Sequence, residues 1–199
     1  MKKILFTLAL LISFSSFGQT SAQYFKSGFD KFEAKDYYGA IADYTKAIEL
    51  NPNGDGSYYN RGLSKANLND YYGAIADFTK AIELNPNGDS YYNRGMSKAD
   101  LNDHYGAIAD YTKAIELDPK YYVAYNNRGN SKGKLKDYYG AIADYTKAIE
   151  LDPNYRNAYT NRGINKENLG DLNGACADWK KAARLGDADA AKWVANQCN

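Results

Sequence analysis

A segment of fourteen residues, YYGAIADYTKAIEL, occupies residues 37–50 and recurs unchanged at residues 138–151. Two further copies differ at one position each, where Phe78 or His104 replaces a tyrosine. The sequence between the copies repeats as well, because Arg-Gly pairs recur at intervals of 33, 34 and 34 residues and Gly28 precedes Gly62 by another 34. A fixed period of this length predicts an array of stacked units, each of which buries its apolar face only against its neighbours.

Each unit is predicted to hold two helices. In the second unit, Asp70 is a favoured N-cap, and apolar residues at helical spacing follow it from Tyr71 to Ile82. Pro86 ends the unit because proline cannot continue a helix and restricts the residue before it. The same cap and the same stop recur in the other units, at Asp36, Asp103, Asp137, Asp171, Pro52, Pro119 and Pro153.

This pattern resembles the tetratricopeptide repeat family from about Ser21 to the end of the chain. In the second unit the residues that carry the resemblance are Tyr58, Gly62, Ala74, Phe78, Ala81 and Pro86. The resemblance implies an all-α, right-handed superhelical solenoid of five helix pairs followed by a C-terminal capping helix. The expected units are residues 21–54, 55–87, 88–121, 122–155 and 156–186, with the capping helix in residues 187–199.

Two positions depart from the family pattern. An arginine precedes the repeated glycine where the family has leucine, and a lysine follows it three residues later where the family has tyrosine. Because buried arginines are paired, we expect each arginine to bond to the recurring aspartate of the second helix. The predicted internal ladder joins Arg61, Arg94, Arg128 and Arg162 to members of the set Asp43, Asp77, Asp110, Asp144 and Asp178.

The last unit and the segment after it differ from the rest. Trp179 replaces the usual tyrosine, and Gly186 with the residue after it stands where the other units have the proline stop. The residues that follow predict an amphipathic helix that covers the final apolar face, with Trp193 as its anchor in the core.

The two cysteines lie ten residues before and twelve residues after Gly186, so two antiparallel helices place Cys176 and Cys198 at a similar height. We predict a disulfide between them, since an exported chain meets an oxidising environment. The alternative is two independently buried thiols.

The first eighteen residues predict a secretory signal peptide. Lys2 and Lys3 form a short positive region, an apolar run follows it, and small residues allow cleavage after Gly18 or after Ala22. We therefore expect an exported chain, periplasmic or secreted, that holds no integral membrane span once the signal is removed. The alternative is an N-terminal anchor that is retained.

The composition argues against chemistry and against nucleic acid. The 25 basic and 24 acidic residues leave no basic field, and one histidine and two cysteines offer little for catalysis or metal binding. No nucleophile-elbow, phosphate-loop or dinucleotide motif is present, so we expect no enzyme, no cofactor and no metal site. His104 is interpreted as a surface substitution.

The resemblance implies a concave channel lined by the first helix of each unit. Residues at i, i+4 and i+7 of these helices share one face, and they differ between units whereas the second helices are nearly identical copies. We predict that the varied face binds a partner through Phe25, Phe29, Phe32, Tyr59, Leu63, Tyr92, Met96, Asn126 and Asn130. The alternative for the three phenylalanines is packing within the first unit, which has no preceding neighbour.

The predicted function is that of a non-enzymatic scaffold that binds a partner protein or peptide in this channel outside the cytoplasm. Asparagines beside the arginines, such as Asn60 and Asn93, are expected to bond to an extended backbone. The alternative is a structural module that associates with copies of itself. The sequence does not name the partner, since a fold alone does not specify one.

Overall fold

Residues 19–198 are described by a computed structural model, and within them the chain forms eleven α-helices and no strand. The predicted signal peptide, residues 1–18, lies outside the described residues. No helix between residues 19 and 198 combines the length and apolarity needed to cross a membrane. The helices are α1 (Ser21–Glu33), α2 (Tyr37–Leu50), α3 (Asp55–Asn67), α4 (Tyr71–Leu84), α5 (Gly88–Asp100), α6 (His104–Leu117), α7 (Tyr122–Lys134), α8 (Tyr138–Leu151), α9 (Arg156–Asn168), α10 (Leu172–Arg184) and α11 (Ala188–Gln197).

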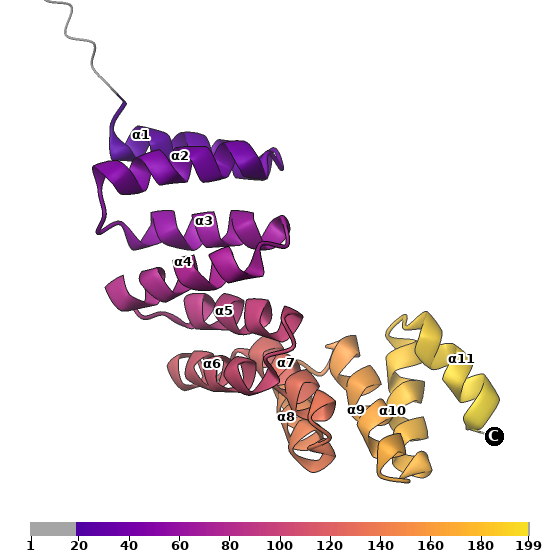
Figure 1. Cartoon of the computed structure of the whole chain (residues 1–199). Helices are drawn as coiled ribbons and strands as arrows, with labels where there is room; N and C mark the ends of the chain where they lie inside the picture. Colours follow the sequence, from indigo (N-terminus) through magenta and orange to yellow (C-terminus); the bar gives the residue numbers. More distant parts are fainter. Residues whose placement is uncertain (1–18, 199) are drawn as a thin grey trace, which may run out of the picture.

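The helices stack in chain order along a curved path, with α1 and α11 at opposite ends (Figure 1). Each odd-numbered helix packs against the even-numbered helix that follows it, and each even-numbered helix packs against the next odd one. Contacts between distant units are almost absent, as expected when each unit touches only its neighbours. The predicted solenoid of helix pairs is confirmed.

The even-numbered helices begin at the aspartates that the sequence predicts. The Asp70 carboxylate accepts a hydrogen bond of 3.0 Å from the backbone N–H of Gly73. A Cβ at residue 73 would lie 2.2 Å from Asp70 Oδ2, so only glycine leaves room for this cap. Four more aspartates make the same bond, namely Asp36, Asp103, Asp137 and Asp171. The repeated Asp-X-X-Gly is therefore a capping motif.

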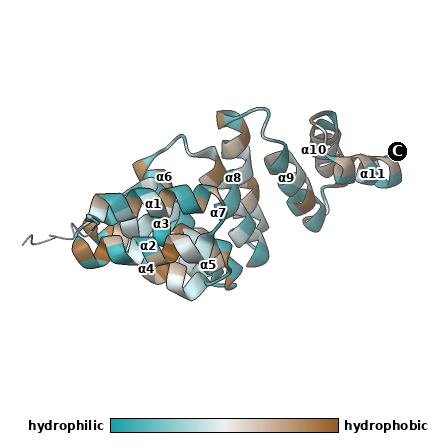
Figure 2. Cartoon of the chain, turned by 90° about the horizontal axis from the view of Figure 1, so that it is seen from above, coloured by the Kyte–Doolittle hydropathy of each residue, from teal (hydrophilic) through white to brown (hydrophobic). Residues whose placement is uncertain are grey.

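One aromatic ring in each even-numbered helix fills the space between paired helices. In α4, Phe78 is fully buried between Ala74 and Ala81, two small residues that let the neighbouring helices approach. Gly62 of α3 faces the ring, and a Cβ there would lie 2.9 Å from Phe78 Cε1. Hydrophobic and hydrophilic segments are interspersed along the helices (Figure 2), as expected when each helix keeps part of its surface in water.

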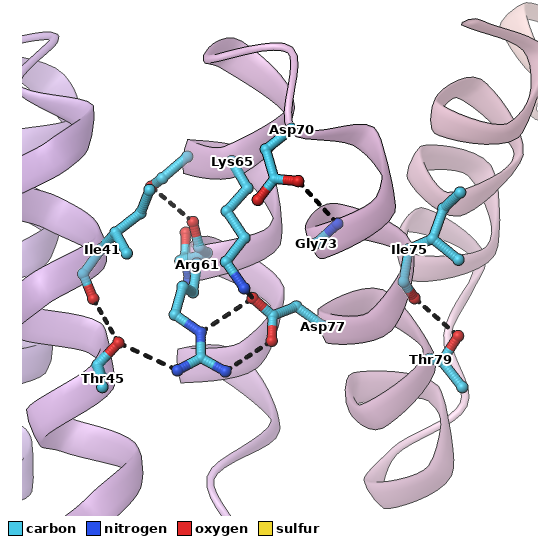
Figure 3. A network of polar contacts seen from close by, with 11 residues as sticks. Ile41, Thr45, Arg61, Lys65, Asp70, Gly73, Ile75, Asp77 and Thr79 are labelled. Carbon is cyan, nitrogen blue, oxygen red and sulfur yellow. Dashed lines mark hydrogen bonds and ion pairs between the residues drawn. The ribbon is translucent and has the colours of Figure 1, made fainter. Parts of the chain in front are cut away.

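The predicted arginine–aspartate ladder is present. Nε and Nη2 of Arg61 donate to the two carboxylate oxygens of Asp77 at 2.9 and 2.7 Å, and Asp77 is 4% exposed. Arg61 Nη1 donates to Thr45 Oγ1 on α2, and Lys65 Nζ lies 2.7 Å from Asp77 Oδ2 (Figure 3). Each arginine thus joins its own unit to the preceding one. The same bonds recur at Arg94, Arg128 and Arg162.

The C-terminal helix α11 packs on α10 and closes the array. Asp187 caps it by accepting hydrogen bonds from two backbone N–H groups of its first turn. Trp193 lies against the fully buried Trp179, with ring centroids 5.3 Å apart. A disulfide joins Cys176 of α10 to Cys198 just after α11, which confirms the predicted pairing.

Candidate functional site: a groove along the odd-numbered helices

Three pockets follow one another along the odd-numbered helices, with volumes of about 200, 250 and 460 Å³. Each is formed by two successive odd-numbered helices and the even-numbered helix between them, and neighbouring pockets share walls. We call this row of pockets the groove. The first is lined among others by Leu63, Ala66, Asn67, Tyr71, Met96 and Asp100, the second by Met96, Asp100, His104, Tyr111, Asn130 and Lys134, and the third by Asn130, Lys134, Tyr138, Asn161, Ile164 and Asn168.

Three of the residues predicted to bind a partner line these pockets. Leu63 lines the first, Met96 lines the wall between the first and the second, and Asn130 lines the wall between the second and the third. Met96 is 38% exposed, an open position for an apolar side chain. The middle position of the predicted face, which these three residues occupy, therefore lines the groove in α3, α5 and α7.

Two predicted groove residues, Tyr59 and Tyr92, join neighbouring units instead of lining pockets. The hydroxyl of Tyr59 accepts a hydrogen bond from Asn93 Nδ2 at 3.1 Å, and that of Tyr92 accepts one from Asn127 Nδ2 at 2.9 Å. Their rings lie 5.8 Å from those of Phe78 and Tyr111 respectively. Burial raises the pKa of Tyr59 and raises the pKa of Tyr92 to about 12.

The asparagines expected to bond to a partner also bond within the chain. Asn126 is only 3% exposed, and its Oδ1 accepts a hydrogen bond from Asn161 Nδ2, so its assignment to an open binding face is wrong. Asn93 and Asn127 donate hydrogen bonds to the hydroxyl oxygens of Tyr59 and Tyr92. Their amide groups hold neighbouring odd-numbered helices in register, one unit apart.

The three phenylalanines of the first unit divide into two kinds. Phe25 packs on Tyr44 with ring centroids 5.7 Å apart, and Phe32 packs on Tyr37 at 5.5 Å. Phe29 is 46% exposed and stays available to a partner. The alternative of packing within the first unit therefore describes Phe25 and Phe32.

The groove also contains residues that the sequence reasoning missed. The last residue of each odd-numbered helix from α3 to α9 lines a pocket: Asn67, Asp100, Lys134 and Asn168. These positions lie four residues after the middle member of the predicted face. Extending that face to i+8 would have included them, and their variation from unit to unit is the signal that was available.

His104 was interpreted as a surface substitution, but it lies in the groove. It is the first residue of α6 and lines the second pocket. The first residues of α4 and α8, Tyr71 and Tyr138, line the first and third pockets in the same way. Its Nδ1 is buried and has no hydrogen-bond partner within residues 19–198. The substitution of a tyrosine by His104 therefore changes the groove itself.

The groove has few groups suited to chemistry. Between residues 19 and 198, no three His, Cys, Asp or Glu side chains gather closely enough to hold a metal ion. Asp100 is partly enclosed, and burial raises the pKa of its carboxyl group. The walls consist chiefly of apolar, amide and hydroxyl groups, which can hold an extended chain by contact and hydrogen bonds.

The tetratricopeptide repeat profiles match residues 31–53, 57–87, 88–121 and 122–155. The chain belongs to the tetratricopeptide repeat family. These matches cover helices from each of the first four helix pairs, and the groove follows the first helices of the repeats. Among curated protein sequences none matches this chain.

Solved structures with the same fold cover most of the repeat protein. A crystal structure of MamA protein is 25% identical, covers 88% of this chain and 94% of that one, and has a TM-score of 0.78. MamA from Desulfovibrio magneticus RS-1 is 21% identical and covers 84% of this chain and 96% of that one, with a TM-score of 0.80. YrrB, described as a TPR protein with an unusual peptide-binding site, is 22% identical, covers 88% and 92%, and has a TM-score of 0.77.

Proposed function

We propose that this repeat protein is a non-enzymatic scaffold that binds an extended segment of a partner protein in its groove. The observation that carries the proposal is the row of three connected pockets, open along the same face in successive units. A single extended chain can place side chains in successive pockets. The peptide-binding site named for YrrB supports the same use of the fold.

The contrast between copied and varied residues also supports this function. The helices α2, α4, α6 and α8, which supply caps, rings and ladder aspartates, are nearly identical. The residues that line the groove change from apolar in the first pocket, with Leu63 and Met96, to amide-rich in the third, with Asn161 and Asn168. The scaffold is constant and the recognition surface varies, as expected when specificity is carried by a few side chains.

We also propose that the protein acts outside the cytoplasm. The predicted signal peptide and the Cys176–Cys198 disulfide support export to an oxidising compartment. Cleavage after Gly18 is favoured over cleavage after Ala22, because Thr20 and Gln23 form a capping box on α1 and Ser21 Oγ donates to the Ala47 carbonyl. N-terminal sequencing of the exported protein tests this, and a start at Gln23 contradicts it.

The test of the function is capture of partners with a matched pair of baits. Leu63→Glu with Met96→Glu places two charges in the apolar part of the groove. The control is Tyr72→Glu, because Tyr72 is 76% exposed and lines none of the three pockets. We expect a partner to bind the native and Tyr72→Glu baits and to be lost from the double variant. Capture of the same partners by all three baits contradicts the proposal.

The alternative function is self-association. The exposed tyrosines near the start of four even-numbered helices, each about three-quarters exposed, favour it: Tyr38, Tyr72, Tyr105 and Tyr139. The capping helix α11 opposes open stacking at the C-terminal end. Mass measured as a function of concentration distinguishes the two functions, since a scaffold for another protein stays monomeric.

A further inference from the structure

Two charged residues of the groove have no partner among the residues that the structure describes. Asp100, at the end of α5, lines the wall between the first and second pockets, and Lys134, at the end of α7, lines the wall between the second and third. Within residues 19–198, neither the Asp100 carboxylate nor the Lys134 ammonium group forms an ion pair or a hydrogen bond. The ladder aspartates, by contrast, each bond to a basic side chain of the first helix.

Asp100 and Lys134 are both exposed, but the surroundings of Asp100 affect its titration. Burial raises the pKa of the Asp100 carboxyl group, and no bond opposes this shift. At Asp43, by contrast, burial also raises the pKa, but the hydrogen bonds from Lys31 and Ser27 outweigh it and lower the pKa. A partly desolvated carboxylate gains free energy when a cation approaches it. The repeat does not require this charge, because Asn67 and Asn168 occupy the same position in other units.

We propose that the groove recognises the order of charges in a bound segment. An apolar side chain occupies the first pocket, a basic side chain pairs with Asp100, and an acidic side chain pairs with Lys134. This inference rests on the proposed function and adds the chemistry of the partner. Asp100 and Lys134 end successive odd-numbered helices that touch each other only weakly. Directly packed helices lie about 10 Å apart and an extended chain advances about 3.3 Å per residue, so the two charge contacts lie at least about three residues apart.

His104 supports a polar occupant of the second pocket. It replaces the tyrosine that the neighbouring pockets have, and its buried Nδ1 lacks a hydrogen-bond partner. Asp100 and Lys134 are the charged groups that line this pocket with it. A buried polar atom that is left unpaired costs free energy, which a hydrogen bond from the bound segment would recover.

The test is selection of random twelve-residue peptides displayed on phage against the immobilised mature protein. We expect selected peptides to share an apolar residue, a basic residue and an acidic residue in that order or its reverse, with the two charged residues at least about three positions apart. The double variant Asp100→Lys with Lys134→Asp should select peptides in which the two charges are exchanged. Lys120→Asp, on the exposed loop between α6 and α7, is the control and should select the native pattern.

Both groove charges are unpaired, so their exchange should leave the thermal unfolding curve unchanged. Suppose that the native protein selects peptides that show no charge order but that the Leu63→Glu and Met96→Glu variant fails to bind. This result would overturn the inference and leave the proposed function standing. The same charge order selected by the native protein and by the exchanged variant would also overturn it. Failure of the native protein to select any peptide contradicts the proposed function and this inference with it.

Discussion

Trp193 follows Tyr159 by 34 residues, one full period, and packs on Trp179 with ring centroids 5.3 Å apart. Tyr159 itself is the aromatic residue that α9 contributes at this position of the repeat. The capping helix α11 therefore matches the first helix of a repeat, which is one half of a unit. Asn196 stands where the second to fifth units have the ladder arginine.

Reduction of the disulfide should loosen this half-unit. Cys176→Ser with Cys198→Ser removes a covalent link between residues 22 apart, which contributes about 3 kcal/mol. We expect α11 to unfold at a lower denaturant concentration than the other helices, measured by tryptophan fluorescence. Reductant added to the native protein should reproduce the effect and should leave the variant unchanged. If the variant and the reduced native protein both unfold in a single transition at the midpoint of the untreated native protein, the prediction is wrong.

Loss of one ladder aspartate should destabilise the centre of the array. Asp110→Asn leaves Arg94 and Lys98 without their shared carboxylate in a site where Asp110 is 3% exposed. Breaking a buried pair from one side costs about 3 kcal/mol. Chemical denaturation measures it. Glu116→Gln, which removes an exposed ion pair to Lys113, is the control and should change the free energy of unfolding far less than Asp110→Asn does.

The turn before each even-numbered helix requires a left-handed residue. Lys136 has φ of 65°, and in the last unit Gly170 occupies the equivalent turn with φ of 83°. Glycine adopts this conformation without steric cost, so Lys136→Gly should stabilise the protein by about 0.5–1 kcal/mol. The reverse change, Gly170→Lys, should destabilise it by a similar amount. Thermal unfolding of the two variants tests this prediction. If both substitutions shift the unfolding temperature in the same direction, the prediction is wrong.

Stability should fall at alkaline pH because of the buried tyrosines. The pKa of Tyr92 is raised to about 12, whereas a tyrosine in the unfolded chain titrates near 10. Between these values only the unfolded state releases the proton, so stability is full below pH 10 and declines as pH rises toward 12. Tyr92→Phe should flatten this decline. Tyr105→Phe, at a 76% exposed position, should leave it unchanged.

The period of the sequence determined most of the fold. Caps such as Asp70, stops such as Pro86 and the buried ring of Phe78 act within one unit, so local sequence specifies them. The ladder from Arg61 to Asp77 was predictable because a buried arginine requires an acidic partner and an aspartate recurs 16 residues after each arginine. The disulfide followed from the antiparallel pairing of two neighbouring helices.

The tertiary structure decided which residues of the odd-numbered helices remain open to a partner. The sequence placed Tyr59, Asn126 and Leu63 on the same predicted face of the odd-numbered helices. The packing of successive units shows that Leu63 lines a pocket, whereas Tyr59 and Asn126 form hydrogen bonds with the next odd-numbered helix. His104 and Asp100 entered the groove for the same reason. The exposure of a side chain depends on the neighbouring units, and a helical pattern contains no information about the gap between two helices.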